Sequence, residues 1–389
     1  MGDKSSRMIT RNSLLPLAIV PVLWVTIGFS LAFGDDLGGI IGNPASFPVY
    51  MNVGNNPDPI LAPDIPLALY AFFQMMFAII TISVIAGATA ESCNPRAWSV
   101  FIILWLLLVY CPLAHMVWHP KGLLYVWGYV DFAGGVPVEI ASGVSAGVVS
   151  LFLGPCKTAA VFNAVAVTTG TAILLFGWFG FNAGCVSAMN GLTVEVAVNT
   201  LMAASTSFLT SVIIEAFLFD TANIVVSCSA IVIGLVAVTP ACGYVTIYFA
   251  MLIGVIACIV SFVVAWVLQR VHIEDVLEVF SAHGVAGIVG VLLTGCFCSS
   301  QVNPNSPDGL VYGNILQFGK HLAVVVCVIP YVSVMTYGIL MLIDLIIPVR
   351  MSLVDLQKME GYHLAHSSIE DGDDITHEKE TLVDDRILI

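Results

Sequence analysis

The sequence has few charged residues: Asp, Glu, Lys and Arg together make up 10% of 389 residues, and only twelve of these are Lys or Arg. A soluble domain typically carries about 25% charged residues. The composition therefore excludes an ordinary soluble globular fold. No nucleic-acid partner is expected for this chain.

The sequence also lacks the cysteine patterns and short motifs of metal sites and enzymes. Its ten cysteines are scattered, the polar stretch 35–65 contains none, and Cys296 and Cys298 form only a CxC pair. This argues against a disulfide framework and against a metal site. The HExxH motif and a catalytic aspartate pair are absent. We expect no cofactor, no metal and no enzymatic activity.

Long apolar blocks dominate what is present, with 59% hydrophobic residues and a mean hydropathy of +0.98. Blocks of about 20 apolar residues are typical of membrane-spanning helices. The first block is too long for the apolar core of a signal peptide. The sequence predicts an all-α polytopic membrane protein with about ten spans, at 14–34, 66–90, 97–118, 136–155, 160–186, 193–217, 222–240, 244–269, 277–298 and 320–348.

The distribution of basic residues predicts the orientation and the domain boundaries. With the N-terminus in the cytoplasm, ten basic residues face inward, whereas only Lys121 and Lys320 face outward. Both termini are then cytoplasmic, and we expect the plasma membrane as the location. The chain divides into a cytoplasmic segment (1–13), a transmembrane domain (14–348) and an acidic cytoplasmic tail (349–389). Such a tail is either a solvated segment or a regulatory element.

Two ionisable side chains, Glu139 and His283, lie within apolar, glycine-rich stretches. A charge at the centre of the bilayer costs roughly 2.5 to more than 10 kcal/mol, so such residues usually mark a path for ions or protons. Their neighbours correspond as well: Asp131 and Gly143 flank Glu139 as Asp275 and Gly287 flank His283. Matching surroundings far apart in sequence indicate two structural repeats that meet at one site.

Each of these residues also has a simpler interpretation. Glu139 follows Pro137 and could be a carboxylate that binds free amides at a helix start. His283 could be a core histidine with its hydrogen bonds satisfied, and Asp131 could cap backbone amides. If instead the imidazole faces the carboxylate across a narrow lumen, the pair can hold or pass a proton.

Aromatic residues form a second candidate group. Trp118 ends the third span, Phe73 and Phe77 are one turn apart on the second, and Trp178 and Phe181 are close together on the fifth. Such residues are often interfacial belt residues. Alternatively, a tryptophan face binds an ammonium-like cation, at about 0.5–2 kcal/mol, and adjacent phenylalanines act as a dry gate.

These stretches together resemble the ammonium transporter family of Amt, Mep and Rh proteins. The matching motifs are FFQMMFA at 72–78, AHMVW at 114–118, DFAGG at 131–135, GWFGFNAG at 177–184, TPACGY at 239–244 and HGVAGIVG at 283–290. The resemblance implies a homotrimer of eleven-helix subunits in a lipid bilayer. Each subunit would be a bundle of two inverted repeats with its own pore for ammonium or ammonia, and methylammonium is a further candidate substrate.

The resemblance also implies roles for individual residues. Trp118, Phe73, Phe77, Cys185 and Asp131 would form the ammonium recruitment site, with Asp131 as its structural aspartate. Phe77 and Phe181 would form the gate, and Trp178 would line the lumen. His283 would be the second lumenal histidine, while Glu139 replaces the first, as in a subset of fungal Mep-like permeases.

Three features depart from the family pattern. Cys185 stands where many bacterial members have a serine, and His363 stands where the tail, with Arg350, Glu360, Gly361 and His366, usually has an aspartate. The family's first helix is absent, because of either a gene prediction that starts too late or a shortened subunit. The expected function is deprotonation of ammonium and passage of ammonia. The alternatives are an ammonium sensor that signals through its tail, with a regulatory protein as partner, and a cation-coupled carrier, which needs broken helices.

Overall fold

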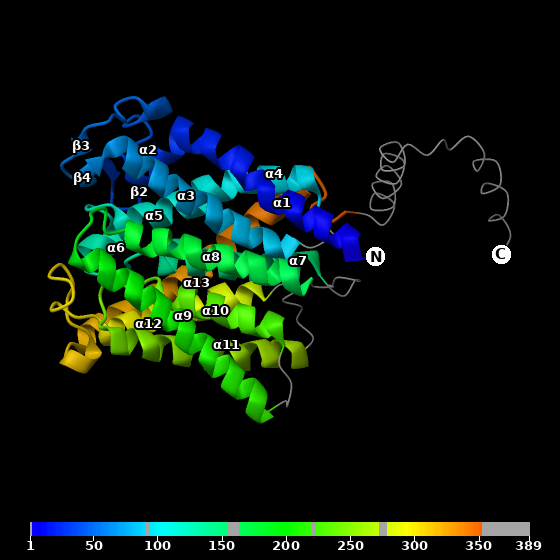
Figure 1. The fold of residues 1–389 in the computed structure, drawn as a ribbon. Helices are drawn as coiled ribbons and strands as arrows, with labels where there is room; N and C mark the ends of the chain where they lie inside the picture. The colour runs from blue at the N-terminus through cyan, green and yellow to red at the C-terminus, as the bar shows by residue number, and fades with distance from the viewer. Residues whose placement is uncertain (1, 90–92, 155–162, 219–222, 272–277, 352–389) are drawn as a thin grey trace, which may run out of the picture.

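The computed structural model describes residues 2–89, 93–154, 163–218, 223–271 and 278–351. Within these ranges, nine helices are long and apolar enough to cross a membrane, and a tenth apolar helix, Ile224–Val238, is shorter. The helices lie side by side in one bundle (Figure 1). The expectation of an all-α membrane protein with about ten spans is confirmed.

Regular α-helices make up most of each span. In chain order they are α1 (Gly2–Leu23), α2 (Phe29–Phe33), α3 (Leu67–Ile85), α4 (Pro95–Trp105), α5 (Cys111–Trp118), α6 (Leu123–Val126), α7 (Ala141–Leu153), α8 (Ala164–Gly184), α9 (Gly191–Leu218), α10 (Ile224–Val238), α11 (Ile247–Arg270), α12 (Ala286–Phe297) and α13 (Ile315–Asp344). Short 3₁₀ turns are η2 (Pro48–Tyr50), η3 (Ala86–Thr89) and η7 (Leu310–Tyr312).

Asparagine side chains begin several of these helices. The Oδ1 atoms of Asn94, Asn163, Asn223 and Asn314 each accept a hydrogen bond from a backbone amide in the first turn of α4, α8, α10 and α13. An N-cap of this kind satisfies one amide donor that the helix itself leaves unpaired. The boundaries of these four helices are therefore set locally by the sequence.

Four spans contain a π-helical segment, which the sequence analysis did not anticipate. They are η1 (Trp24–Gly28), η4 (Leu106–Tyr110), η5 (Gly135–Ile140) and η6 (Phe280–Val285). Two of them, η5 and η6, contain Glu139 and His283 respectively. Short π-helical segments are frequent at functional sites because the extra residue re-aims the side chains of one turn.

The stretch between the first two spans folds into two small hairpins. Strand β1 (Asp36–Leu37) pairs antiparallel with β2 (Ile41–Gly42), and β3 (Pro57–Asp58) pairs antiparallel with β4 (Ala62–Pro66). They lie at the end of the bundle opposite to the start of α1 (Figure 1). Arg350 forms a backbone bridge with Cys93, which precedes α4. Both ends of the described chain therefore lie at the same end of the bundle.

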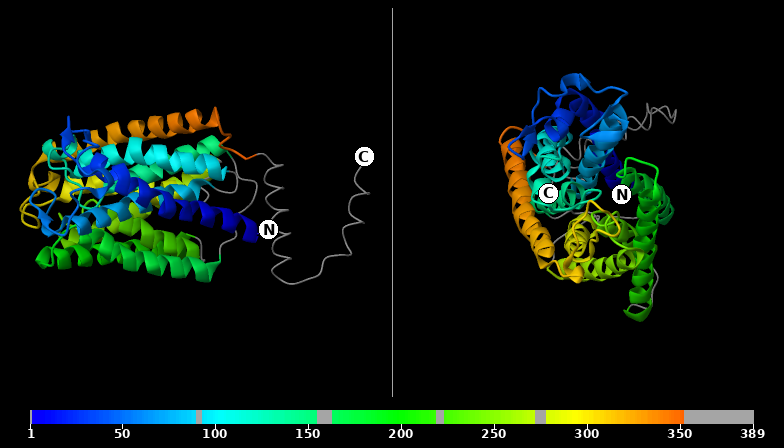
Figure 2. Two further views of the ribbon diagram at one scale, coloured as in Figure 1. Left: turned by 90° about the horizontal axis from the view of Figure 1, so that it is seen from above. Right: turned by 90° about the vertical axis from the view of Figure 1, so that its left-hand side faces the viewer.

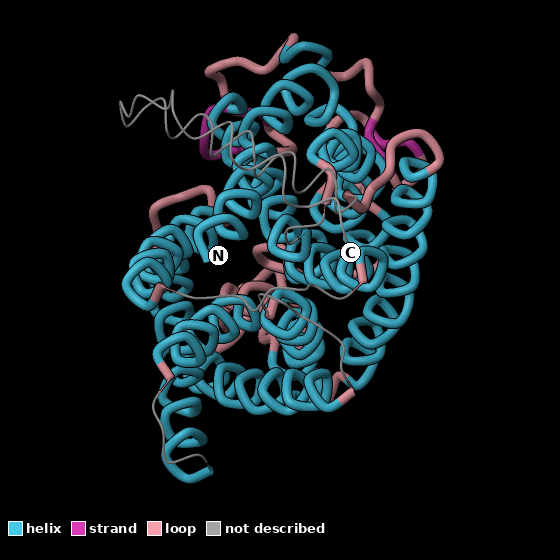
Figure 3. Tube along the Cα trace, turned by 90° about the vertical axis from the view of Figure 1, so that its right-hand side faces the viewer, coloured by secondary structure: helices cyan, strands magenta, loops and turns pink. Residues whose placement is uncertain are grey.

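The buried core consists of two parts, and one long helix packs against both. One apolar cluster is built from α1, α3, α4, α7 and α13, with Val20, Val149 and Val332 among its buried residues. The other consists mainly of residues from the consecutive helices α8 to α12. Helix α13 packs against α4, α7 and α12, and Figure 2 shows it along the outside of both parts. Figure 3 shows the bundle from the end at which α1 begins.

The last span begins earlier than predicted, at Ile315 and not at 320. Its first turns contain polar residues that mask the apolar pattern. Gln317 Nε2 donates to the carbonyl of Gly128, and a ring nitrogen of His321 lies 2.8 Å from the carbonyl oxygen of Val291. These polar groups are accommodated inside the bundle by partners distant in sequence.

Candidate functional site

The structure brings Glu139 and His283 together. Nδ1 of His283 lies 2.7 Å from Oε2 of Glu139, and the side chains of His283 and Glu139 are only 13% and 1% exposed. The two residues are 144 positions apart in the sequence. The carboxyl and imidazole groups therefore form one buried hydrogen-bonded pair between the two halves of the chain.

Glycines bring the two π-helical segments close together in a reciprocal way. A Cβ added to Gly143 would overlap the backbone of Gly284, and a Cβ added to Gly287 would lie 2.9 Å from the Cβ of Glu139. The glycine four residues after each ionisable residue thus makes room for the segment that contains the other. This arrangement explains the matching sequence surroundings of the pair.

The second carboxylate oxygen of Glu139 is the notable polar atom at the site. Oε1 is buried and has no hydrogen-bond partner among the described residues. Leaving a buried acceptor unpaired costs about 1–3 kcal/mol, and more for a charged group. The pair therefore retains one acceptor beside the bond to His283.

Asp131, and not Glu139, is the carboxylate that binds the amides at the helix start. Its two oxygens accept hydrogen bonds from the amides of Gly134, Gly135 and Val136 at 2.7–2.8 Å. The hydroxyl of Tyr129 donates to the same carboxylate at 3.2 Å. Burial raises the pKa of Asp131 above its usual value, although these hydrogen bonds oppose the shift. The interpretation of Asp131 as a structural cap agrees with this geometry, and the helix-start interpretation of Glu139 does not.

The five predicted aromatic residues form one continuous group of rings. Ring centroids are 5.6 Å apart for Trp118 and Phe77, 4.3 Å for Phe77 and Phe181, and 5.1 Å for Phe181 and Trp178. Phe73 packs edge-on against Phe77 at 4.9 Å. Phe77 and Trp178 are only 1% and 5% exposed, and the other three rings are partly buried, so the group lies within the bundle and does not form an interfacial belt.

Hydrogen bonds fix both tryptophans of this group. Nε1 of Trp118 donates to the carbonyl of Asp131 at 3.3 Å. Nε1 of Trp178 donates to Oγ1 of Thr239 at 3.0 Å, and Thr239 in turn donates to the carbonyl of Leu235. A tryptophan whose N–H is satisfied inside the protein is held in one orientation.

Cys185 lies beside the aromatic group and donates its thiol to the carbonyl of Phe181, at 3.3 Å. The neighbouring Gly184 contacts the ring of Phe73 so closely that an added Cβ would lie 2.7 Å from it. The structure therefore places Cys185, Phe73 and Phe181 close to one another.

Sequence reasoning missed the residues that support the site. Thr239 holds Trp178, and Tyr129 holds Asp131, but both contacts depend on the fold. The sequence signal for Thr239 was present, because it begins the TPACGY motif. Tyr129 is only two residues from Asp131, and its hydroxyl could have been considered as a partner.

Several predicted residues lie outside the described part of the chain. These are Asp275, the proposed counterpart of Asp131, and the tail residues Glu360, Gly361, His363 and His366. Within the described residues, no group of three or more His, Cys, Asp or Glu side chains could hold a metal ion.

Comparison with known proteins agrees with this geometry. The family model described as Ammonium Transporter Family matches residues 2–367. The chain is 37% identical to an ammonium transporter of Aquifex aeolicus, over 90% of this chain and 82% of the relative. It is 34% identical to ammonium transporter 1 of Dictyostelium discoideum, over 90% of this chain and 77% of the relative. The crystal structure of Saccharomyces cerevisiae Mep2 superposes with a TM-score of 0.81 at 30% identity, covering 87% of this chain and 81% of Mep2. The chain belongs to the ammonium transporter family.

Proposed function

We propose that this protein transports ammonium by removing its proton and passing neutral ammonia through the bundle. The observation that carries the proposal is the buried pair of Glu139 and His283, with the 2.7 Å bond between them and the unpaired Oε1 of Glu139. Ammonia would pass this pair, and the proton would travel through it.

Desolvation favours passage of the neutral form. An ionised group in an apolar medium is strongly penalised, whereas a small neutral amine loses only its hydrogen bonds to water. The aromatic group is suited to the first step, because the face of Trp118 can attract an ammonium ion at about 0.5–2 kcal/mol. The closely packed rings of Phe77 and Phe181 then exclude a hydrated ion.

The pair can relay a proton along the bond between its two groups. In one state Nδ1–H of His283 donates to the ionised Glu139 carboxylate, which leaves Nε2 as an acceptor. If Nε2 receives a proton, the Nδ1 proton can pass to Oε2, which leaves a neutral carboxyl group beside a neutral imidazole protonated at Nε2. Loss of the proton from Glu139 restores the carboxylate, and the first state returns once the imidazole has exchanged its proton from Nε2 to Nδ1. Each cycle moves one proton and returns the pair to its single negative charge.

The site also suggests the direction of the path and the assembly. Trp118 and the β-hairpins lie at the end of the bundle that the basic residues assign to the outside, so recruitment would begin there. Ammonium is the proposed substrate, with methylammonium as an analogue. The proposed state is a homotrimer in the plasma membrane with both termini in the cytoplasm.

The proposal can be tested by replacing Glu139 with alanine. We expect the ammonium-dependent current in proteoliposomes to fall by about 100-fold, the lower range for a positioned proton-transfer group. Ser142→Ala is the matched control, since Ser142 is buried one turn along and its hydroxyl bonds only to the carbonyl of Glu139. An undiminished current in Glu139→Ala, with normal protein amounts, would exclude the proton path.

The sensor alternative depends on the acidic tail, and residues 352–389 are outside the described part of the chain. The carrier alternative requires spans with unwound backbone. The described spans instead contain π-helical segments, which keep a continuous helical path. Transport through the Glu139–His283 pair is therefore the function that the geometry supports best.

A further inference from the structure

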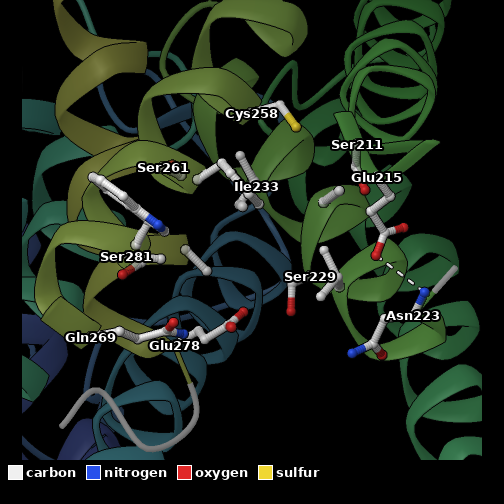
Figure 4. A pocket seen from close by; sticks show the side chains of 16 residues that line it. Ser211, Glu215, Asn223, Ser229, Ile233, Cys258, Ser261, Gln269, Glu278 and Ser281 are labelled. Carbon is white, nitrogen blue, oxygen red and sulfur yellow. Dashed lines mark hydrogen bonds between the residues drawn. The ribbon is translucent and has the colours of Figure 1, made fainter. Parts of the chain in front are cut away.

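A cavity of about 280 Å³ lies between α9, α10, α11 and η6, apart from the Glu139–His283 pair (Figure 4). It opens near the C-terminal ends of α9 and α11, at the end of the bundle where α1 begins (Figure 1). Its polar lining residues include Ser211, Glu215, Asn223, Ser229, Ser261 and Glu278. Neither Glu139 nor His283 lines it.

Two serine hydroxyls in its wall are buried without a protein partner in the described chain. Ser211 on α9 is 4% exposed and Ser261 on α11 is 1% exposed, and the Oγ of each has no hydrogen-bond partner among the described residues. Most serines inside such helices instead donate to the carbonyl of the preceding turn. Because each unpaired hydroxyl costs about 1–3 kcal/mol, two of them on one cavity indicate that something else satisfies them.

The cavity wall is negative. Glu215 lies one turn after Ser211 on the same face of α9, and it is 6% exposed. Its Oε1 accepts a hydrogen bond from the amide of Asn223 at 3.1 Å, which holds the carboxylate in the wall (Figure 4). Glu278 lines the same cavity, and none of the lining residues in the described chain is basic.

The basic residue beside this region is already engaged. The guanidinium of Arg270 lies 4.5 Å from the centre of the Trp266 ring, at the end of α11. Such a cation–π contact keeps the charge on the aromatic face. Arg270 itself does not line the cavity.

We propose that this cavity binds a small monovalent cation, such as ammonium or potassium, through the Glu215 carboxylate and the hydroxyls of Ser211 and Ser261. Ca²⁺ takes six to eight oxygen ligands, whereas the Glu215 carboxylate with two neutral hydroxyl oxygens suits a single positive charge. The volume also leaves room for several waters, at about 30 Å³ each. The site does not depend on the transport mechanism.

The test uses cysteine reporters in the full-length purified protein. In Ser211→Cys, we expect a cationic aminoethyl methanethiosulfonate reagent to react about tenfold or more faster than its anionic sulfonatoethyl analogue, because a negative cavity concentrates cations. Site-resolved mass spectrometry separates this thiol from the native cysteines. Ammonium chloride should slow the reaction, whereas N-methylglucamine chloride of equal ionic strength should not. A potassium chloride arm determines whether the site prefers ammonium.

Matched variants separate the cavity from its surroundings. Val212→Cys, on the exposed side of α9, should show neither charge preference nor protection. Adding Glu215→Gln to the reporter should abolish the preference. Ser229→Cys is a second reporter that keeps both unpaired hydroxyls. Equal rates with both reagents, no protection by either ion, or no reaction at either reporter would overturn the proposal. Glu139→Ala should leave the protection unchanged, so failure of the transport mechanism and failure of this site are distinguishable.

Discussion

At the scale of single residues, the site depends on side chains that line the proposed substrate path and on others that fix the orientation of those side chains. Thr239 belongs to the second kind. Its hydroxyl is the hydrogen-bond partner of Trp178 and is completely buried. It touches none of the groups proposed to move protons, so it is a positioning residue.

Replacing Thr239 with valine keeps the shape but leaves the N–H of Trp178 without its acceptor. We expect a loss of about 1–3 kcal/mol of stability and a several-fold fall in maximal transport, because the ring is less firmly held. The affinity for ammonium should change little. Thr239→Ser, which keeps the hydroxyl, should restore most of the activity. Equal effects of valine and serine would mean that the methyl group, and not the hydrogen bond, matters.

The pairing of Glu139 with His283 could be predicted from the sequence, and its geometry could not. Matching flanks indicated that two repeats meet, since an aspartate and a glycine recur at the same offsets. The contact between Thr239 and Trp178 left no comparable signal, because it forms only after segments 61 residues apart pack together. Tyr129 lies only two residues from Asp131, so its contact could have been considered from the sequence. The unpaired hydroxyls of Ser211 and Ser261 also left no signal in the sequence, since the cavity that they line is formed by α9, α10, α11 and η6.

At the scale of elements, close packing of η5 with η6 is the feature on which the pair depends. The backbone of Gly284 occupies the place where a side chain at Gly143 would begin. The amino-acid pattern predicted small residues at helix contacts. It did not predict π-helical turns, because the shift in hydrogen bonding by one residue has no distinct composition.

Substituting Gly143 with alanine should force η6 away from α7. The expected cost is about 1–3 kcal/mol, typical of an overpacked core, together with loss of transport as the bond between Glu139 and His283 lengthens. Gly338→Ala is the control, because a Cβ at that position of α13 meets nothing within 4 Å. Thermal unfolding and ammonium flux are measured on both variants. If Gly143→Ala and Gly338→Ala show the same stability and the same flux, the close contact of Gly143 with Gly284 is not needed for the pair.

The hairpin of β1 and β2 is tied to the bundle by an acid-sensitive contact. Oδ1 of Asp36 lies 3.0 Å from Nε2 of His115 on α5 and accepts the amide of Gly39 at 2.6 Å. The bond to His115 is the main cause that lowers the pKa of Asp36 below its usual 3.8. A carboxyl group whose pKa is lower in the folded than in the unfolded protein stabilises the fold at pH values above its unfolded pKa. This contribution is lost as the pH falls through the folded pKa.

Asp36→Asn should therefore be less stable than the parent protein at pH 7, by up to about 1 kcal/mol for a partly exposed pair. The difference in melting temperature should shrink as the pH falls below about 4. Melting curves in detergent at a series of pH values measure this. A difference that stayed constant down to about pH 3, below the unfolded pKa of an aspartate, would show that the carboxylate charge is not responsible.

At the scale of the whole molecule, the number of crossings decides where the two ends lie. Nine long helices and the shorter α10 give ten crossings among the described residues, so the start of α1 and the end of α13 share one side (Figure 1). Hydropathy predicted this count well because each apolar block is close to or above the length of about 20 residues that a span needs. The fold alone does not say which side of the membrane this is. The excess of basic residues at this end predicts that it faces the cytoplasm.

Cysteine labelling on intact cells tests that choice. In a Cys327→Ser background, chosen because Cys327 is exposed, we expect Val49→Cys and Met189→Cys to react with a membrane-impermeant maleimide. Both side chains are exposed, at 65% and 93%, at the end of the bundle that contains the hairpins. Val271→Cys, exposed after α11 at the opposite end, should react only after the cells are opened. Labelling of Val271→Cys alone on intact cells would reverse the orientation, and with it the side from which Trp118 receives ammonium.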